Sequence, residues 1–335
     1  MVLKVISALA LVAIGALLLI VAWPSLFGLT LAPYVAQLVA LRSLVAVIAL
    51  VAAAVTLIVA VASRRARRFA GALAVMLVAF AGLNVAVQSV RGLGGAPVPE
   101  VAAEGEWTVV AWNTLGEAVD ADLIAALALD EQADVVVLPE TRAATAEQAA
   151  ILMREAGRPM WVYTVAFDEV AAARSTSVLV SAEIGQYEID DTVGNTQVLP
   201  SVVLRPLDHD GPTIIGVHPV APIPVQLDNW RADLAWLDEV CQGERIILAG
   251  DLNATPDHFA ARDNADGVGD CVSAALTTGS GAVGTWPTGL HPLLGAPIDH
   301  IMSTPDMPAT SFEVLRGLDV GNSDHRPIVA RILVN

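Results

Sequence analysis

The sequence has no aspartate or glutamate in positions 1–90 and no lysine after Lys4. Six of the eighteen basic residues lie in that acid-free segment, so positions 91–335 carry twelve basic residues against all thirty-five acidic ones, a net charge of −23. Proteins that bind nucleic acid rely on basic patches that displace counterions from the phosphates. The charge of positions 91–335 therefore argues against nucleic acid as a partner.

Cysteine is scarce as well, with only Cys241 and Cys271 in the chain. Both lie well after the acid-free segment, on either side of Asp251. A disulfide between them would brace the chain around Asp251 if this part of the protein reaches an oxidising compartment. Two buried free thiols are the alternative, and the sequence leaves both open.

Charged residues are nearly absent from three long stretches, at about 2–22, 44–62 and 69–90. Each approaches the ~20 apolar residues that a helix needs to cross the hydrocarbon core of a bilayer. No polar face interrupts these runs, as it would in a helix on the surface of a soluble protein. We therefore expect a membrane anchor with three transmembrane helices over 1–90.

The arginines predict the orientation of these spans. Four of them lie in "SRRARR", 63–68, between the second and third stretches, and such clusters stay on the cytoplasmic side. The N-terminus is then inside, and everything after the third span is extracytoplasmic. Arg42 falls at the outer end of the second span, where we expect its side chain to reach toward the lipid headgroups.

The segment 91–106, "RGLGGAPVPEVAAEGE", is rich in glycine, proline and alanine and predicts a linker. The remaining segment, 107–335, is long enough to bury the core of one domain. β-rich runs and helical patterns intermingle there, which predicts an α/β fold of sheets covered by helices. The expected strands are 107–113, 134–140, 175–181, 201–206, 213–218, 245–251, 298–303 and 326–334, and the expected helices are 119–132, 145–156 and 226–241.

Several of the expected strands end on a polar residue. These strand ends are Asn113, Glu140, His218 and Asp251. In "ILAGDLNATP", 247–256, Asp251 and Asn253 are two residues apart, so in an extended chain their side chains lie on the same face. If the strand ends meet at one rim of the sheets, these residues form a site.

Seven motifs resemble, in order and approximate spacing, the endonuclease/exonuclease/phosphatase superfamily: VVAWNTLG, DVVVLPET, IIGVHPVAP, ILAGDLNATP, TWPTG, PIDHIM and SDHRPIVA. The resemblance covers 107–335 and does not touch the anchor, so the chain looks like a membrane-anchored bacterial member. It implies a four-layer α/β sandwich, with two packed mixed β-sheets flanked by helices. It also implies metal-dependent hydrolysis of a phosphate ester by in-line attack of water.

On the metal side, the resemblance implies that Glu140 is the principal carboxylate ligand, with Asn113 and Asp324 beside it. A hard cation prefers oxygen ligands and keeps several waters, so one or two carboxylates suffice. The implied cofactor is Mg²⁺, with Mn²⁺ or Ca²⁺ as alternatives.

On the substrate side, Asp251 resembles the residue that orients or deprotonates the attacking water, and Asn253 the residue that hydrogen-bonds the phosphate or the nucleophile. His218 and His325 match the histidines that contact the phosphoryl oxygens as charge develops. Asp299 matches the carboxylate that orients His325 and favours its protonated form.

One motif departs from the family pattern. In "ARSTSVLVS", 173–181, Ser177 stands where glycine is common, so Arg174 is carried over only as a candidate phosphate contact. A membrane anchor raises the effective concentration of substrates carried by lipids. We therefore expect an extracytoplasmic phosphoesterase acting on a phosphate mono- or diester, either lipid-linked or a small envelope metabolite.

Two other functions stay open from the sequence: an extracytoplasmic nuclease that cleaves DNA or RNA, and a catalytically silent domain that binds a phospholipid or a partner. The set of Glu140, Asp251, Asn253, Asp299 and His325 favours an enzyme, because a silent domain has no need of all five. The expected partners are the lipid bilayer and a phosphate ester, and nothing in the sequence indicates an oligomeric state.

Overall fold

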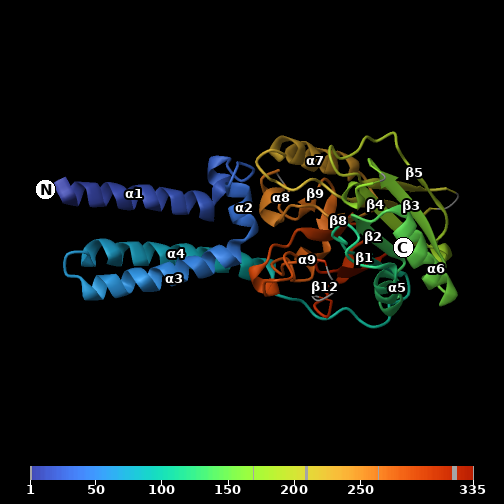
Figure 1. Ribbon diagram of the computed structural model, residues 1–335, viewed down its shortest axis with the longest axis horizontal. Helices are drawn as coiled ribbons and strands as arrows, with labels where there is room; N and C mark the ends of the chain where they lie inside the picture. The colour runs from blue at the N-terminus through green and yellow to red at the C-terminus, as the bar shows by residue number, and fades with distance from the viewer. Residues whose placement is uncertain (1, 169, 208–209, 263, 319–322, 335) are drawn as a thin grey trace. The chain divides into compact units, whose positions relative to one another are not determined.

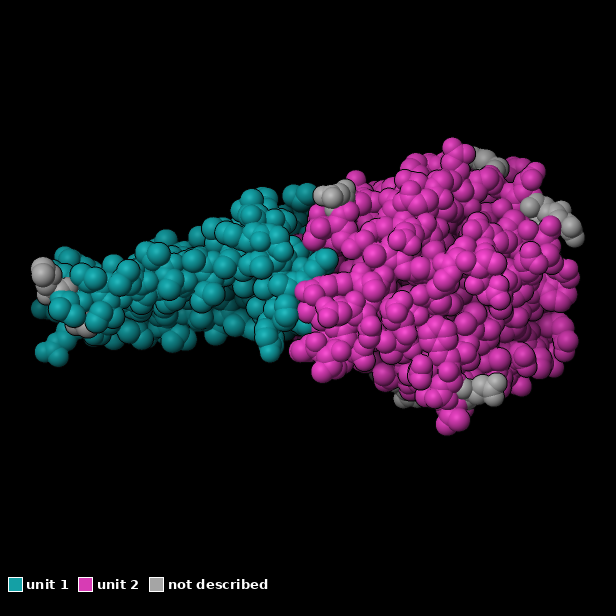
Figure 2. All heavy atoms as spheres, turned by 90° about the horizontal axis from the view of Figure 1, so that it is seen from above, with its two compact units in different colours: residues 1–91 teal, residues 92–335 magenta. Residues whose placement is uncertain are grey.

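The computed structural model describes residues 2–168, 170–207, 210–262, 264–318 and 323–334. The chain divides into two compact units, Met1–Arg91 (unit 1) and Gly92–Asn335 (unit 2), which Figure 2 colours teal and magenta. Each unit has buried hydrophobic residues of its own, so each is described by itself.

Unit 1 is built from three long apolar helices (Figure 1). These helices, α1 (Val2–Ala22), α3 (Arg42–Ala62) and α4 (Arg67–Arg91), are each long and apolar enough to cross a membrane. A short 3-10 turn, η1 (Pro24–Phe27), and a short helix, α2 (Val35–Ala40), lie between α1 and α3. The prediction of three helices of membrane-spanning length is confirmed.

Arg42 is buried inside unit 1, whereas the sequence predicted that it would extend toward lipid headgroups. Its Nη1 donates to the Ala22 carbonyl at 3.0 Å and to Asn84 Oδ1 at 2.8 Å. The carbonyls at a helix C-terminus lack intrahelical donors, and the guanidinium supplies one to α1. Arg42, at the start of α3, therefore joins the end of α1 to α4.

Unit 2 contains two mixed β-sheets. The first has six strands in the order β12-β13-β1-β2-β4-β3: β1 (Glu106–Ala111), β2 (Val135–Pro139), β3 (Met160–Ala166), β4 (Ser175–Ser181), β12 (Ala309–Val314) and β13 (Ile328–Leu333). The second has seven strands in the order β5-β6-β7-β8-β11-β10-β9: β5 (Tyr187–Ile189), β6 (Val202–Pro206), β7 (Thr213–Val217), β8 (Ile246–Asp251), β9 (Gly267–Val268), β10 (Cys271–Ser273) and β11 (Asp299–Ser303). The helices are α5 (Ala121–Asp130), α6 (Ala143–Glu155), α7 (Leu227–Val240), α8 (Pro256–Ala260) and α9 (Ala274–Thr277), with 3-10 turns η2 (Ala172–Arg174), η3 (Ala182–Ile184) and η4 (Pro292–Leu294).

The alternation of side chains along β1 explains the layers of unit 2. Val109 and Ala111 pack in the core between the two sheets. Val110 and the following Trp112 point the other way, into a second core shared with α5 and α6. Successive side chains of a strand face opposite sides, so one apolar strand serves two cores.

Helix α7 lies on the outer side of the second sheet, where Trp230 Nε1 donates to the Asn253 carbonyl at 3.1 Å. The order of layers is therefore helices, first sheet, second sheet, helices (Figure 1). The predicted four-layer α/β sandwich is confirmed. The two sheets approach closely at Gly216 of β7, since a Cβ there would lie 2.5 Å from Val178 Cγ2 of β4.

From Gly92 onward, the segment predicted to be a linker, 91–106, is part of unit 2 and is hydrogen-bonded to the rest of it. The Gly94 N–H donates to the Gly279 carbonyl at 3.1 Å. Arg331, buried in β13, donates from Nη2 to the Pro99 carbonyl at 3.0 Å. This segment thus contributes to the folded unit instead of hanging free of it.

Cys241 and Cys271 are joined in a disulfide, with their Cα atoms 5.9 Å apart. The bond links the end of α7 to the start of β10. Of the two alternatives that the sequence left open, the disulfide is the one found.

Candidate active site

Strand ends from both sheets meet at one rim of unit 2. β1 runs parallel to β2 and β7 parallel to β8, so the chain leaves each pair in one direction. Asn113 Nδ2 donates to Glu140 Oε1 at 3.2 Å and to Asp251 Oδ2 at 3.0 Å. His218 Nε2 lies 3.8 Å from Glu140 Oε1. The four strand ends singled out in the sequence are thus neighbours in space.

Asp251 lies at the centre of this cluster and is 1% exposed. Its Oδ2 also accepts from Asn253 Nδ2 at 3.2 Å, and its Oδ1 accepts from the Asn253 backbone N–H at 2.8 Å. Burial, together with the negative charge of Asp299, raises the pKa of Asp251 to about 7 against the opposing effects of His325 and these hydrogen bonds. A carboxyl that changes protonation near neutral pH is suited to accept a proton from water.

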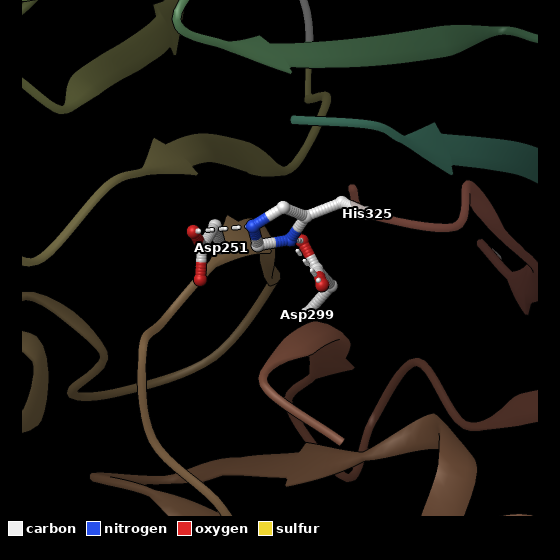
Figure 3. A group of neighbouring side chains, drawn as sticks. All are labelled: Asp251, Asp299 and His325. Atoms are coloured by element: carbon white, nitrogen blue, oxygen red, sulfur yellow. Dashed lines mark hydrogen bonds and ion pairs between the residues drawn. The ribbon is translucent and has the colours of Figure 1, made fainter. Parts of the chain in front are cut away.

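His325 lies between two carboxylates (Figure 3). Its Nδ1 is 2.9 Å from Asp299 Oδ2, and its Nε2 is 3.8 Å from Asp251 Oδ2. Trp112 Nε1 fixes the backbone of His325 by donating to its carbonyl at 2.9 Å. Burial acts to lower the pKa of His325, but the charges of Asp299 and Asp251 outweigh it and raise the pKa to about 10. The imidazole is therefore a cationic donor at neutral pH.

His218 is the second histidine of the cluster, and its Nε2 lies 4.0 Å from Asp251 Oδ2. Its backbone N–H donates to Ser201 Oγ at 3.0 Å, which fixes the chain directly after β7. Complete burial and the positive charge of His325 lower the pKa of His218 to about 3. The ring is therefore neutral at neutral pH, and its buried Nδ1 has no hydrogen-bond partner within the described residues.

Glu140 and Asn253 both have left-handed backbones, with φ of +62° and +46°. Residues other than glycine seldom adopt this conformation, and those that do cluster at functional sites. Burial raises the pKa of Glu140, the hydrogen bond from Asn113 and the charge of His325 lower it, and the charge of Asp324 raises it. Glu140 thus experiences a second negative charge close by.

Asp324 is held by Trp286, whose Nε1 donates to Asp324 Oδ2 at 2.8 Å. The other carboxylate oxygen, Oδ1, lies 3.9 Å from His325 Nε2. That oxygen is buried and has no hydrogen-bond partner in the part of the chain that the structure describes. The sequence assigned no role to Trp286, and only its place in the motif "TWPTG" could have pointed to this contact.

Arg174 is the one candidate residue that does not join the cluster. Arg174 precedes β4, whose Thr176 is paired with Pro139 of β2. It therefore lies at the same end of these strands as Glu140. Across the described ranges, no hydrogen bond links its guanidinium to Glu140 or Asp251, and its buried Nε has no partner. Asn253 is inside the cluster, and its Nδ2 also donates to the Pro219 carbonyl at 3.0 Å.

The residues at this rim fit a hard divalent cation. Asp251, Asp299 and His325 each offer one potential ligand atom, all within 4.8 Å of one another. A protonated histidine is not a metal ligand, however, and the carboxylate of Asp299 is already paired with it. Glu140 and Asp324 offer carboxylate oxygens, and the unpartnered Oδ1 of Asp324 is the kind of buried acceptor that a cation satisfies.

Comparison with known proteins agrees with this fold. Residues 110–325 match the sequence model of the Endonuclease/Exonuclease/phosphatase family. An endonuclease/exonuclease/phosphatase structure from Beutenbergia cavernae DSM 12333 is similar at 19% identity and a TM-score of 0.52, over 69% of this chain and 72% of that chain. TDP2 from D. rerio, complexed with a single-strand DNA product, is similar at 17% identity and a TM-score of 0.51, over 68% of this chain and 99% of that chain. An endonuclease/exonuclease/phosphatase from Bacteroides vulgatus is similar at 17% identity and a TM-score of 0.50, over 69% of this chain and 100% of that chain.

No curated protein matches this sequence. The sequence identities to these solved structures are too low to imply a shared substrate, so the similarity supports the fold alone. The family match spans most of unit 2, including every residue of the cluster around Asp251. The chain therefore belongs to the Endonuclease/Exonuclease/phosphatase family, whose members hydrolyse phosphoester bonds.

Proposed function

We propose that unit 2 is a divalent-metal-dependent phosphoesterase, anchored by unit 1 and exposed on the extracytoplasmic side of the membrane. Its substrate is a phosphate mono- or diester that is either lipid-linked or a small envelope metabolite. One observation carries the proposal: Asp251 is a buried carboxyl with a pKa of about 7, set between two asparagine donors and a protonated histidine. A proton acceptor beside a cationic donor is the pairing that attack of water on a phosphate requires.

Glu140 and Asp324 would hold the cation through carboxylate oxygens, Glu140 Oε1 and the Oδ1 of Asp324 that has no hydrogen-bond partner among the described residues. Asn113 would orient Glu140 by donating from Nδ2, because its Oδ1 already accepts from the Leu115 N–H. When bound, the ion would offset the negative charge of the phosphate and polarise its oxygens. Mg²⁺ suits this oxygen-rich set, with Mn²⁺ or Ca²⁺ as alternatives.

The side chains around Asp251 divide the remaining work. Asp251 takes the proton from the attacking water, and the amides of Asn113 and Asn253 keep its carboxylate in place. His325 donates from Nε2 to a phosphoryl oxygen while Asp299 keeps the ring charged and oriented. His218, being neutral, positions a phosphoryl oxygen by hydrogen bonding without adding charge.

Charge argues against nucleic acid as the substrate. Of the twelve basic residues in 91–335, five are paired with acidic side chains: Arg142, Arg158, Arg205, Arg231 and Arg262. Arg326 and Arg331 are buried. Few basic side chains of unit 2 then remain that could contact the phosphates of a nucleic acid and displace its counterions. The D. rerio relative is bound to DNA, but at 17% identity it supports a shared fold only.

Two observations support the extracytoplasmic location. The arginine cluster at 63–68 favours a cytoplasmic loop between the second and third spans, and with such a loop unit 2 would lie on the other side of the membrane. The Cys241–Cys271 bond supports an extracytoplasmic location, because disulfides form and persist in oxidising compartments. Protease digestion of intact spheroplasts tests the location: unit 2 should be degraded from outside, and protection until the membrane is lysed would contradict it.

The activity is tested with the full chain in detergent micelles. A panel of envelope lipids, polyprenyl phosphates, inositol phosphates and plasmid DNA is incubated with Mg²⁺ or with chelator, and phosphate release is followed by mass spectrometry. We expect metal-dependent release from lipid-linked or small esters, lost in Asp251→Ala and retained in the exposed control Asp228→Ala. Turnover that is independent of metal, or unchanged in Asp251→Ala, would overturn the proposal, and cleavage of DNA alone would replace it with a nuclease.

A further inference from the structure

Hydroxyl groups hydrogen-bond to the backbone carbonyls of the left-handed Glu140 and of the residue after it. Three residues supply them, Thr114, Thr141 and Ser177, and we call this group the hydroxyl clamp. All three side chains are fully buried, with 0% exposure. None of the three had a role among the expected catalytic, metal or substrate residues.

The hydroxyls of the clamp hydrogen-bond to the backbone around Glu140 and to one another. Thr114 Oγ1 donates to the Glu140 carbonyl at 3.0 Å and lies 2.9 Å from Thr141 Oγ1. Ser177 Oγ donates to the Thr141 carbonyl at 2.9 Å. Thr164 Oγ1, on β3, lies 2.7 Å from Ser177 Oγ and continues the chain toward the edge of the first sheet.

These bonds are needed because Glu140 follows the last residue of β2, where the sheet no longer supplies donors to the backbone carbonyls. A buried carbonyl without a donor is strongly unfavourable. A left-handed residue with a side chain adds a further cost at Glu140. The clamp supplies the missing donors to the carbonyls of Glu140 and Thr141, and so favours the backbone conformation in which Glu140 is left-handed.

The clamp also joins the two chain segments that carry Asn113 and Glu140, the residues at the proposed metal site. Thr114 follows Asn113, and Thr141 follows Glu140. The amide of Asn113 meets the carboxylate of Glu140 on one side of the chain, at 3.2 Å, while the hydroxyls of Thr114 and Thr141 meet on the other. These two contacts together restrict how the Asn113–Thr114 segment can rotate relative to the Glu140–Thr141 segment.

We propose that the hydroxyl clamp sets the affinity of this rim for a divalent cation by holding the Glu140 carboxylate in its binding orientation. Thr114, Thr141 and Ser177 are then positioning residues, which act through Glu140. The inference rests on the proposed role of Glu140 as a metal ligand. Groups that orient a ligand in this way change metal affinity by roughly 10-fold or more when they are removed.

The test measures binding of Mn²⁺ to the full chain in detergent micelles, by the loss of the electron paramagnetic resonance signal of free Mn²⁺. Thr114→Val and Ser177→Ala should each weaken Mn²⁺ binding by roughly 10-fold. Thr114→Ser, which keeps the hydroxyl, should restore it. Ser303→Ala is the matched control, because Ser303 is buried and donates to the Met307 carbonyl at the opposite end of β11 from Asp299.

Thermal melting without metal separates this role from a general loss of stability. Variants that melt like Ser303→Ala yet bind Mn²⁺ more weakly support the clamp. Wild-type Mn²⁺ affinity in both Thr114→Val and Ser177→Ala, or equal weakening in Ser303→Ala, would overturn it. If the wild type binds Mn²⁺, the clamp variants bind it more weakly and no ester is cleaved, the clamp stands and the proposed function falls. Both fall if the wild type binds no divalent cation.

Discussion

Asp299 and Asp251 face each other directly across the paired strands β11 and β8, and the ring of His325 touches both carboxylates. Like charges placed opposite each other on adjacent strands destabilise a sheet unless a cation lies between them. Here a protonated imidazole provides the positive charge. The pairing therefore couples the stability of the second sheet to the protonation of one histidine.

Asp299→Asn should lower the pKa of His325, because it removes the largest influence that raises it. In the wild type this pKa is about 10, so loss of activity through deprotonation of His325 should occur above neutral pH. The variant's alkaline limb should move to lower pH by about 1–3 pH units. The pH–rate profile measures this, with Asp228→Asn as an exposed control. An unchanged alkaline limb would show that His325 keeps its charge without Asp299.

Asp251→Asn should abolish most hydrolysis yet stabilise the metal-free protein at alkaline pH. The folded pKa of Asp251 is raised to about 7 from 3.8, so its stabilising contribution is present in acid and is lost as pH rises through about 7. Melting temperatures in chelator should therefore favour the variant more at about pH 8 than at about pH 5. A difference in melting temperature between variant and wild type that stays constant across this pH range would contradict the raised pKa of Asp251.

Binding of Mg²⁺ should release protons and weaken as the pH falls. Burial raises the pKa of both Glu140 and Asp251, and a nearby cation favours the charged form of each carboxyl, so cation binding is coupled to proton release. Added Mg²⁺ should raise the melting temperature more at about pH 8 than at about pH 6. Glu140→Gln should remove the effect, whereas the exposed Glu188→Gln should keep it. Stabilisation that does not depend on pH would place the ion away from these carboxyls.

Loss of the disulfide should destabilise unit 2 by about 3–4 kcal/mol, since the bond closes a loop between residues 30 apart in sequence. The double variant Cys241→Ser/Cys271→Ser should melt earlier than the wild type. A reducing agent should lower the melting temperature of the wild type and leave the variant unchanged. Equal effects on both proteins would mean that the bond contributes nothing to stability.

Most of the fold could be predicted because the buried strands carry a continuous apolar signal. All eight expected strands are present, since each is a short run of β-branched residues between polar ends. The strands that were missed include β3, β5 and β12, which lie at sheet edges. An edge strand packs against one neighbour only, so a sequence such as "ATSFEV" in β12 mixes polar and apolar residues and leaves no clear pattern.

The cluster around Asp251 could be predicted because the ends of paired strands meet at one rim and bring together polar residues that are distant in sequence. The contacts that support these residues could not be predicted. Trp286 binds Asp324 across 38 residues and Ser177 binds the Thr141 carbonyl across 36, and neither pair leaves a periodic signal. Arg42 was misjudged for a related reason, because its partners Ala22 and Asn84 belong to other helices.

Gly94 and Pro99 belong to unit 2 and are hydrogen-bonded to the rest of it, which decides where an anchor-free version of the protein should begin. A chain starting at Trp107 would keep every catalytic candidate but strip the Arg331 guanidinium, buried in β13, of its Pro99 acceptor. A chain starting at Gly92 would keep the Gly94–Gly279 hydrogen bond, and the Arg331 guanidinium would keep its Pro99 acceptor.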